Sequence, residues 1–457
     1  MKATIVNPVA ETVTTTATTN TSTAINLVTA ALKRASEKPV EPGTRIPLGA
    51  PPLTPLAMVG FWDKPVHIQL NHFEHKSLSD WACNFSVGCS HGCRFCYVPG
   101  VSAKFLAPKL KELYGVDDPD GQWGDYVLLR PLDEALLLKD IQAAENRPLS
   151  RLSVDGNRAV MLCTTTDAYQ TITAPDIELQ RRLNAERAHT VRRTLELIRD
   201  HSTLNVRILT RSPLARQDFD LFATFGNRLM FGMSLPTLDN KLARIYEPNA
   251  PSPTQRLATL KAAKDRGLNI FVAVAPTYAE CGEADIRATL LAVKELNPLT
   301  VYHECINVRA DNIERIAEHA EAEGKVLNTA VFDTPNAWRA YSMDSLRMVQ
   351  RVAKEVGLEN QLHLWPDAGL QSENAFHEIR KAEWNRQHPD LKLSTEQRAE
   401  LKRHNEAAYA EHLAWLEGWW SRISEWPGVE RAAWTPPASP ANSPFTVPAL
   451  QSLTVNA

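Results

Sequence analysis

Short apolar runs alternate with longer segments of helical period between Trp81 and Trp365. The runs have the length and composition of buried strands, and each is followed by a polar loop. This alternation predicts βαβ units around a parallel sheet, and right-handed crossovers curl such units into a full or partial barrel. The predicted strands are Ala159–Thr164, Leu204–Thr210, Arg228–Leu235, Leu268–Ala275 and Thr300–Cys305, and a sixth strand would lead into a loop that begins at Cys89.

Helices are predicted in the gaps between these strands. Proline is tolerated in a first helical turn, and glycine suits the left-handed residue that ends a helix. Pro175, Pro213 and Pro253 are therefore predicted helix starts, and Gly267 and Gly324 are predicted helix ends. The expected helices are Pro175–His201, Pro213–Phe225, Pro253–Arg266, Glu283–Leu296 and Asp311–Gly324.

The two ends of the chain differ in composition from its centre. Residues 1–55 are expected to form a disordered leader and a Pro- and Gly-rich extended approach. Residues 56–370 are expected to form the core barrel. Residues 371–430 are predicted to form two tryptophan-bearing helices, broken near Pro389, that pack over the barrel, and residues 431–457 a disordered tail.

Charge and cysteine usage limit the function classes. The 50 basic and 53 acidic residues give a formal charge of -3, so no global positive field attracts nucleic acid or a membrane surface, although a local basic groove is compatible with this balance. No apolar stretch approaches the roughly 18 residues of a membrane helix. Three of the seven cysteines lie within eight positions, unlike the distributed pairs of a disulfide framework. We expect a soluble, cytoplasmic protein without a membrane partner.

The three clustered cysteines form the motif with the most specific chemistry. Cys89, Cys93 and Cys96 have CxxxCxxC spacing in a loop after a predicted strand. Three thiolates this close can converge on three irons of a 4Fe-4S cubane and leave the fourth iron without a protein ligand. Gly88 and Gly92 allow the tight turns that wrapping a cluster requires.

A structural zinc site is the alternative interpretation, with His91 joining the three cysteines as a Cys3His set. Zinc modules usually bring their ligands as two separated pairs. Here all four candidates lie within eight residues inside a predicted βα enzyme. This crowding favours the cluster.

The loop resembles that of the radical S-adenosylmethionine (SAM) superfamily, whose hallmark is CxxxCxΦC with an aromatic Φ, here Phe95. The resemblance implies a partial (β/α)6 TIM-like barrel, extended here by the C-terminal helices. It implies that the amino and carboxylate groups of SAM chelate the open iron. One electron, from a reductant such as flavodoxin or ferredoxin, then cleaves the C5'–S bond to a 5'-deoxyadenosyl radical, which abstracts hydrogen from a substrate.

Five stretches are similar to the spore photoproduct lyase-like branch of that superfamily, which is also described as DNA repair photolyase-related. Together they span the region from Asn84 to Arg256, over a third of the chain. They are NFSVGCSHGCRFCY from Asn84, TDAYQ from Thr166, LTRS from Leu209, MSLPT from Met233 and EPNAPSPTQR from Glu247.

Polar residues at the predicted strand ends are the candidate cofactor ligands. Thr166 and Asp167 offer a hydroxyl and a carboxylate for the ammonium and hydroxyls of a cofactor, or they simply start a turn. Arg211, next to Ser212, offers a bidentate fork for a carboxylate where the family commonly has lysine. Ser234 could meet a ribose hydroxyl or the methionine moiety, or satisfy a backbone group.

Three further residues have competing interpretations. Glu247 could be an active-site carboxylate, but a surface helix terminus is the simpler interpretation. His303 ends a strand where substrate should lie, although a satisfied core histidine is the commoner case. Spore photoproduct lyase uses a thiol as hydrogen donor to a substrate radical, so the resemblance makes Cys163 a candidate donor; a free cysteine is more often a small buried hydrophobe.

The sequence thus favours a radical enzyme whose substrate is a nucleic-acid lesion, or alternatively RNA, a peptide or a small metabolite. A basic stripe at the barrel mouth would favour nucleic acid, and a closed apolar or carboxylate-lined cavity would favour a metabolite. The competing class is a non-enzymatic zinc or nucleic-acid binding module with the C-terminal tryptophans as a stacking surface. Their helix-compatible spacing makes core packing the better explanation.

Overall fold

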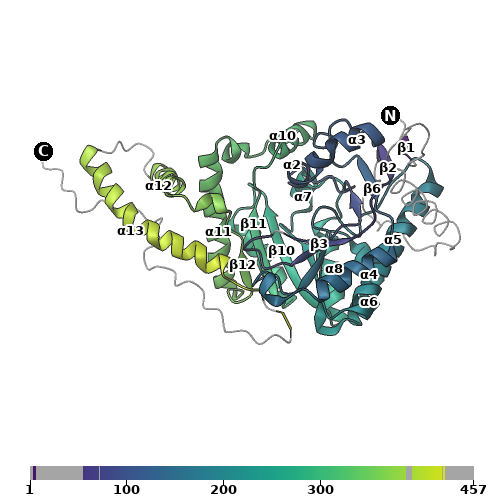
Figure 1. The fold of residues 1–457 in the computed structure, drawn as a ribbon. Coiled ribbons are helices and arrows are strands. Elements are labelled where there is room, and N and C mark those ends of the chain that lie inside the picture. Colours follow the sequence, from purple (N-terminus) through teal and green to yellow (C-terminus); the bar gives the residue numbers. More distant parts are fainter. Residues whose placement is uncertain (1–3, 7–54, 72, 388–393, 425, 428–457) are drawn as a thin grey trace.

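The computed structural model describes residues 4–6, 55–71, 73–387, 394–424 and 426–427. An eight-stranded sheet with the order β12-β11-β10-β9-β8-β7-β4-β3 forms its centre (Figure 1). All neighbours from β4 to β12 are parallel, whereas β3 is antiparallel to β4. The strands are β3 (Ile68–Leu70), β4 (Trp81–Cys83), β7 (Ala159–Leu162), β8 (Asn205–Thr210), β9 (Leu229–Ser234), β10 (Asn269–Thr277), β11 (Thr300–Cys305) and β12 (Leu362–Leu364).

The six predicted barrel strands are β4, β7, β8, β9, β10 and β11, and they follow one another in the sheet in chain order. This order confirms the α/β architecture with repeated parallel crossovers. The short strands β3 and β12 lie at the two edges and were not predicted. The six parallel strands follow the order of a partial barrel, and the pairings of the described residues do not join the two edges to each other.

The helices between the barrel strands agree with most predicted boundaries. Pro213 and Pro253 begin their helices, and Gly267 and Gly324 have left-handed φ values of 82° and 65°. The prediction for Pro175 is wrong, because the following residue caps the helix through its carboxylate and the helix starts later. The predicted 213–225 helix is a 3-10 turn followed by a short α-helix. The elements are α5 (Ile177–His201), η3 (Pro213–Asp218), α6 (Phe219–Ala223), η4 (Gly226–Arg228), α7 (Asn240–Tyr246), α8 (Pro253–Asp265), α9 (Glu283–Glu295) and α10 (Asn312–Ala322).

A second, smaller sheet supports the cysteine loop and was not predicted. Its order is β1-β2-β6-β5, and β5 ends directly before Gly88. Its first strand lies in the segment expected to be a leader. Its strands are β1 (Thr4–Val6), β2 (Met58–Phe61), β5 (Ser86–Val87) and β6 (Tyr126–Leu129), and the nearby helices are α2 (Val98–Val101), η1 (Ala103–Leu106), α3 (Ala107–Tyr114), α4 (Glu134–Glu145) and η2 (Leu149–Arg151).

The C-terminal helices pack against the barrel through their tryptophans. Trp384, Trp415, Trp419 and Trp420 are all buried, which confirms core packing for these side chains. Figure 1 shows α12 and α13 beside α11, away from the small sheet. Pro389 and the segments 7–54 and 428–457 lie outside the described residues, so the domain boundaries remain predictions. The elements are η5 (Thr329–Phe332), α11 (Pro335–Val356), η6 (Ala368–Leu370), α12 (Glu373–Gln387) and α13 (Thr395–Trp420).

Aromatic and charged side chains close the barrel at the end where its strands begin. The buried Arg207 guanidinium lies 5.0 Å from the Trp426 ring and donates to Tyr302 Oη at 2.5 Å. Trp426 in turn donates to the backbone oxygen of Asn227, just before β9. We therefore expect the functional site at the opposite end of the barrel, where the strands terminate. In the described part of the chain, no helix is long and apolar enough to span a membrane.

His303 belongs to the core. Its side chain is fully buried in β11, with Nδ1 3.0 Å from the backbone oxygen of Val274 and Nε2 3.3 Å from Ser345 Oγ. Burial lowers the pKa of His303 to about 4, so the ring is neutral at physiological pH. The satisfied core histidine is thus the correct interpretation.

Candidate active site

The cysteine loop begins where two sheets meet, because β4 belongs to the large sheet and β5 to the small one. Gly88 and Gly92 have φ values of +85° and +55°. A Cβ on Gly88 would lie 2.2 Å from the backbone oxygen of Tyr126, and a Cβ on Gly92 would lie 3.1 Å from Gly124 Cα. Both glycines are therefore required by backbone conformation and by close approach, as the sequence predicts.

The three thiols of the loop are close enough to affect one another. Cys89 and Cys93 are buried and Cys96 is partly buried. Burial, followed by the neighbouring Cys93 thiol, raises the pKa of Cys89 well above its ordinary value. Burial likewise raises the pKa of Cys93 to about 12, although the Arg211 guanidinium acts in the opposite direction. Neighbouring buried thiols need a positive centre to become thiolates, and three sulfur donors on one loop are the ligand type that an iron-sulfur cluster uses. In the described part of the chain, however, no three His, Cys, Asp or Glu side chains are arranged to hold a metal ion.

His91, which lies between Cys89 and Cys93 in sequence, contacts a carboxylate. Its buried Nδ1 lies 3.6 Å from Asp167 Oδ2. Burial lowers the pKa of His91, and the Asp167 carboxylate partly opposes this. The contact places His91 in the polar network beside the loop.

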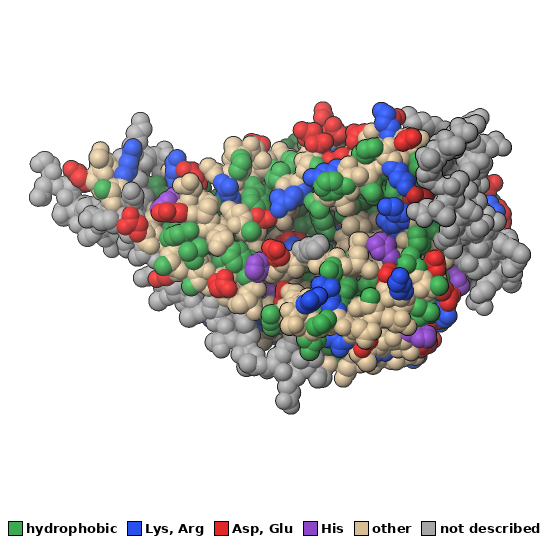
Figure 2. All heavy atoms as spheres, viewed as in Figure 1, with side chains coloured by type: hydrophobic (Ala, Val, Ile, Leu, Met, Phe, Trp, Pro, Cys, Tyr) green, Lys and Arg blue, Asp and Glu red, His purple; other side chains and the backbone are tan. Residues whose placement is uncertain are grey.

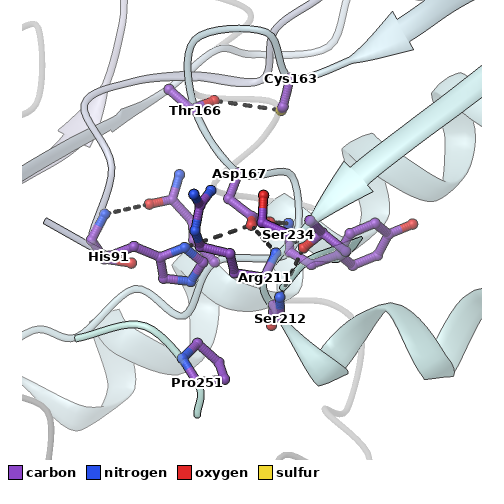
Figure 3. A network of polar contacts seen from close by, with 12 residues as sticks. His91, Cys163, Thr166, Asp167, Arg211, Ser212, Ser234 and Pro251 are labelled. Carbon is purple, nitrogen blue, oxygen red and sulfur yellow. Dashed lines mark hydrogen bonds and ion pairs between the residues drawn. The ribbon is translucent and has the colours of Figure 1, made fainter. Parts of the chain in front are cut away.

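Asp167 joins the ends of two strands to the cysteine loop. Its Oδ1 accepts hydrogen bonds from Thr210 Oγ1 at 2.7 Å and from the Tyr169 backbone at 2.8 Å, and its Oδ2 accepts one from the Arg211 backbone at 2.8 Å. Figure 3 shows His91, Asp167 and Arg211 gathered in this network. The carboxylate fixes the backbone from which the Arg211 side chain starts.

The Arg211 side chain extends from this point to a buried carboxylate. Its Nε donates to Glu247 Oε1 at 2.9 Å, and its guanidinium lies 5.6 Å from the centre of the Phe95 ring, between Cys93 and Cys96 in sequence. Glu247 is buried and also pairs with Arg256. The interpretation of Glu247 as a surface helix terminus is therefore wrong. Burial alone would raise the pKa of Glu247, but the charges of Arg256 and Arg211 outweigh it and hold that pKa below its ordinary value.

The other predicted site residues form two sets near Arg211: Ser212 with Ser234, and Thr166 with Cys163. Ser212 Oγ accepts the Leu214 N–H at 3.3 Å and caps η3, while Ser234 ends β9 beside the Arg256 side chain. Thr166 Oγ1 instead donates to Cys163 Sγ at 3.4 Å. Figure 3 shows Cys163 and Thr166 as a pair above the Arg211, Ser212 and Ser234 group, with Asp167 between them.

Cys163 has an unusual backbone for a cysteine. Its φ is +60°, directly after β7, and its N–H donates to the Cys83 backbone oxygen at 2.8 Å. Burial raises the pKa of Cys163 to about 12, so its sulfur carries its proton at neutral pH. A left-handed non-glycine residue costs conformational energy and occurs often at functional sites.

Two residues that support the loop were not singled out from the sequence, although both lie in the stretches that carry the family resemblance. The Gln170 side chain accepts the Ser90 N–H at 2.7 Å and donates to Ser86 Oγ at 3.0 Å, holding both ends of the turn at Cys89. The Asn84 amide accepts the Thr165 N–H at 3.1 Å. Both amide side chains lie within the TDAYQ and NFSVG stretches. The sequence alone does not show which distant residues they bind.

A family model, described as the Radical SAM superfamily, matches residues 83–290. The chain is also 31% identical over 248 residues to the uncharacterized protein ORF301 of Acidianus two-tailed virus, a match that covers 53% of this chain and 72% of that protein. The chain belongs to the radical SAM superfamily. The matched residues include the cysteine loop and every candidate cofactor residue from Phe95 to Ser234. This membership confirms the superfamily predicted from the cysteine motif.

Other similar proteins and structures have lower sequence identity to this chain. An uncharacterized protein of Methanocaldococcus jannaschii is 24% identical over 234 residues, with 50% of this chain and 71% of that protein covered. A variant of spore photoproduct lyase has a TM-score of 0.46 at 12% identity and covers 67% of this chain and 80% of its own. Another spore photoproduct lyase structure, described with bound AdoMet and dinucleoside spore photoproduct, has a TM-score of 0.44 at 13% identity, with 67% and 80% covered.

Proposed function

We propose that this radical SAM protein binds a 4Fe-4S cluster through Cys89, Cys93 and Cys96 and abstracts hydrogen from an organic substrate. The observation that carries the proposal is the partly exposed Arg211 guanidinium, which lies over Phe95 beside the three-thiol loop. When bound, the cluster and SAM supply reductive cleavage of the C5'–S bond to a 5'-deoxyadenosyl radical. A one-electron carrier such as flavodoxin or ferredoxin is the proposed reductant.

The chain's own residues bind and orient the cofactor in this proposal. Arg211 binds the methionine carboxylate, because its fork matches a carboxylate and its charge is opposite. Asp167 and Thr166 hold the loop after β7, and Thr166 can turn its hydroxyl from Cys163 to the cofactor. Ser212 and Ser234 place hydroxyl groups at the adjacent strand ends, within reach of ribose or methionine atoms.

A nucleic-acid lesion is the first substrate class that we propose to test. The five stretches that resemble the spore photoproduct lyase-like branch support it. Figure 2 shows Lys and Arg side chains along the upper side of a hollow in the face viewed there, which suits a phosphate backbone. RNA, a peptide and a small metabolite are the alternatives. Lys76 Nζ lies 2.6 Å from Glu304 Oε2 in β11, and such an ion pair suits a smaller polar substrate.

Reconstitution tests the proposed function directly. Anaerobic loading with iron and sulfide is expected to give a brown protein with absorption near roughly 400 nm and about four irons per chain. Adding dithionite and SAM should then release 5'-deoxyadenosine, measured by chromatography and mass spectrometry. Protein without iron is the control. A colourless protein that retains one zinc and forms no 5'-deoxyadenosine would contradict the proposal.

We also propose Cys163 as the hydrogen donor to the product radical. Transfer of its Sγ hydrogen atom would quench the radical and leave a thiyl radical, which one electron from the external carrier and a proton restore to the thiol. With a substrate in D2O, the wild-type product should carry deuterium from the exchanged thiol. Cys163→Ala should keep 5'-deoxyadenosine formation and lose this labelled product. Cys83→Ala, which removes another buried thiol of the same core, is the control and should keep both; a labelled product from Cys163→Ala would exclude this role.

A further inference from the structure

Three charged side chains form a continuous chain behind the cysteine loop. Arg256, in α8, pairs with Oε2 of Glu247, and Oε1 of the same carboxylate accepts the Nε–H of Arg211 at 2.9 Å. Arg256 and Glu247 are almost completely buried, whereas the Arg211 side chain is 19% exposed. The chain therefore leads from the protein interior to the surface of the candidate cofactor site.

Arg256 is the fixed end of this chain. Its Nε donates to the Pro251 backbone oxygen at 2.7 Å, one terminal nitrogen donates to the Ser234 backbone oxygen at 3.2 Å, and the other donates to Glu247. The guanidinium thus uses all three of its nitrogens on acceptors of fixed position. Its charge also offsets that of Glu247, so Glu247 does not cancel the positive charge of Arg211.

Arg211 is the open end. Among the described residues, its side chain donates only through Nε, to Glu247, and its two terminal nitrogens make no protein hydrogen bond. Nε and the terminal nitrogens lie in one rigid plane, so holding Nε also orients the terminal nitrogens. The Phe95 ring, 5.6 Å from the guanidinium carbon, limits the remaining motion. An arginine held in this way loses little side-chain freedom when it binds a carboxylate.

We propose that Glu247, held by Arg256, is a positioning residue that orients Arg211 to bind the carboxylate of SAM. This proposal rests on the proposed function and deepens it. Glu247 does not touch the cofactor; it fixes the direction and the charge of the group that does. In this role, Glu247 increases the affinity for SAM relative to the affinity for the same molecule without its carboxylate.

The test compares SAM with decarboxylated SAM on anaerobic, iron-loaded protein by isothermal titration calorimetry. Wild-type protein should bind SAM more tightly by at least the roughly 10- to 150-fold of a hydrogen bond to a charged group, because the carboxylate would also chelate the open iron. Glu247→Gln replaces the carboxylate with an amide that cannot accept from both arginines, and it should lower this preference on the order of tenfold. Affinity for decarboxylated SAM and iron content should stay near the wild-type values. A merely structural role would weaken both ligands equally.

Asp218→Asn is the matched control, because Asp218 is also a buried carboxylate paired with an arginine, Arg192, at 2.7 Å. It should keep the full preference for SAM. Where Glu247→Gln does not fold, Glu247→Asp retains the charge but shortens the side chain by one methylene, and it should also lose preference. Full preference in a folded Glu247 variant overturns the inference. Absence of SAM binding in the wild type instead overturns the proposed function.

Discussion

Replacing Cys93 with alanine is expected to remove the iron-sulfur cluster and abolish 5'-deoxyadenosine formation. Cys93 supplies one of three thiolates, and the loss of one deprives an iron of its protein ligand and destabilises the whole cubane. The loop itself should keep its shape, because Gln170 and the glycines hold it without the sulfur. Iron content, visible absorption and product release by the anaerobically reconstituted variant measure the effect.

Cys281→Ala is the matched control for this substitution. Cys281 is a buried core cysteine whose sulfur lies 4.0 Å from the Pro236 backbone oxygen, before α9. Its substitution should leave iron binding and SAM cleavage largely intact. If Cys281→Ala lost both as completely as Cys93→Ala, Cys281 would be a fourth thiolate ligand of the cluster. No iron would then remain without a protein ligand to bind SAM.

Arg211→Ala is expected to weaken SAM binding by about 1.5 to 3 kcal/mol, the range for a hydrogen bond to a charged group, which is roughly 10- to 150-fold in Kd. The cluster should remain, because all three thiolates are present. Glu247 should also stay ionised, since Arg256 still pairs with it in the variant. Calorimetric titration of SAM into the iron-loaded variant measures the loss.

Arg266→Ala provides the comparison for Arg211→Ala. Arg266 follows α8 and pairs with Asp220 on the surface, where both side chains are largely exposed. Removing this exposed charge should change SAM affinity little, because surface ion pairs contribute weakly and solvent screens them. Equal SAM affinity in the wild type and Arg211→Ala would show that Arg211 has another role.

The repeated strand and helix pattern was readable because it depends on local period and composition. β11 has the predicted bounds, and the helix starts at Pro213 and Pro253 follow from the missing proline N–H. The cysteine loop was also readable, since CxxxCxxC spacing brings three thiols together without any long-range contact. These local features were sufficient for the superfamily and for the strand ends that carry Asp167 and Arg211.

Only the tertiary structure shows which partners the polar residues have. Spacing along the chain does not show that Glu247 is buried between Arg211 and Arg256, or that His91 contacts Asp167. The small sheet escaped prediction for the same reason: its strands are short, and β2 and β5 come together only through β6, far along the chain. Local patterns determine which elements form, whereas burial and charge pairing arise only when distant segments meet.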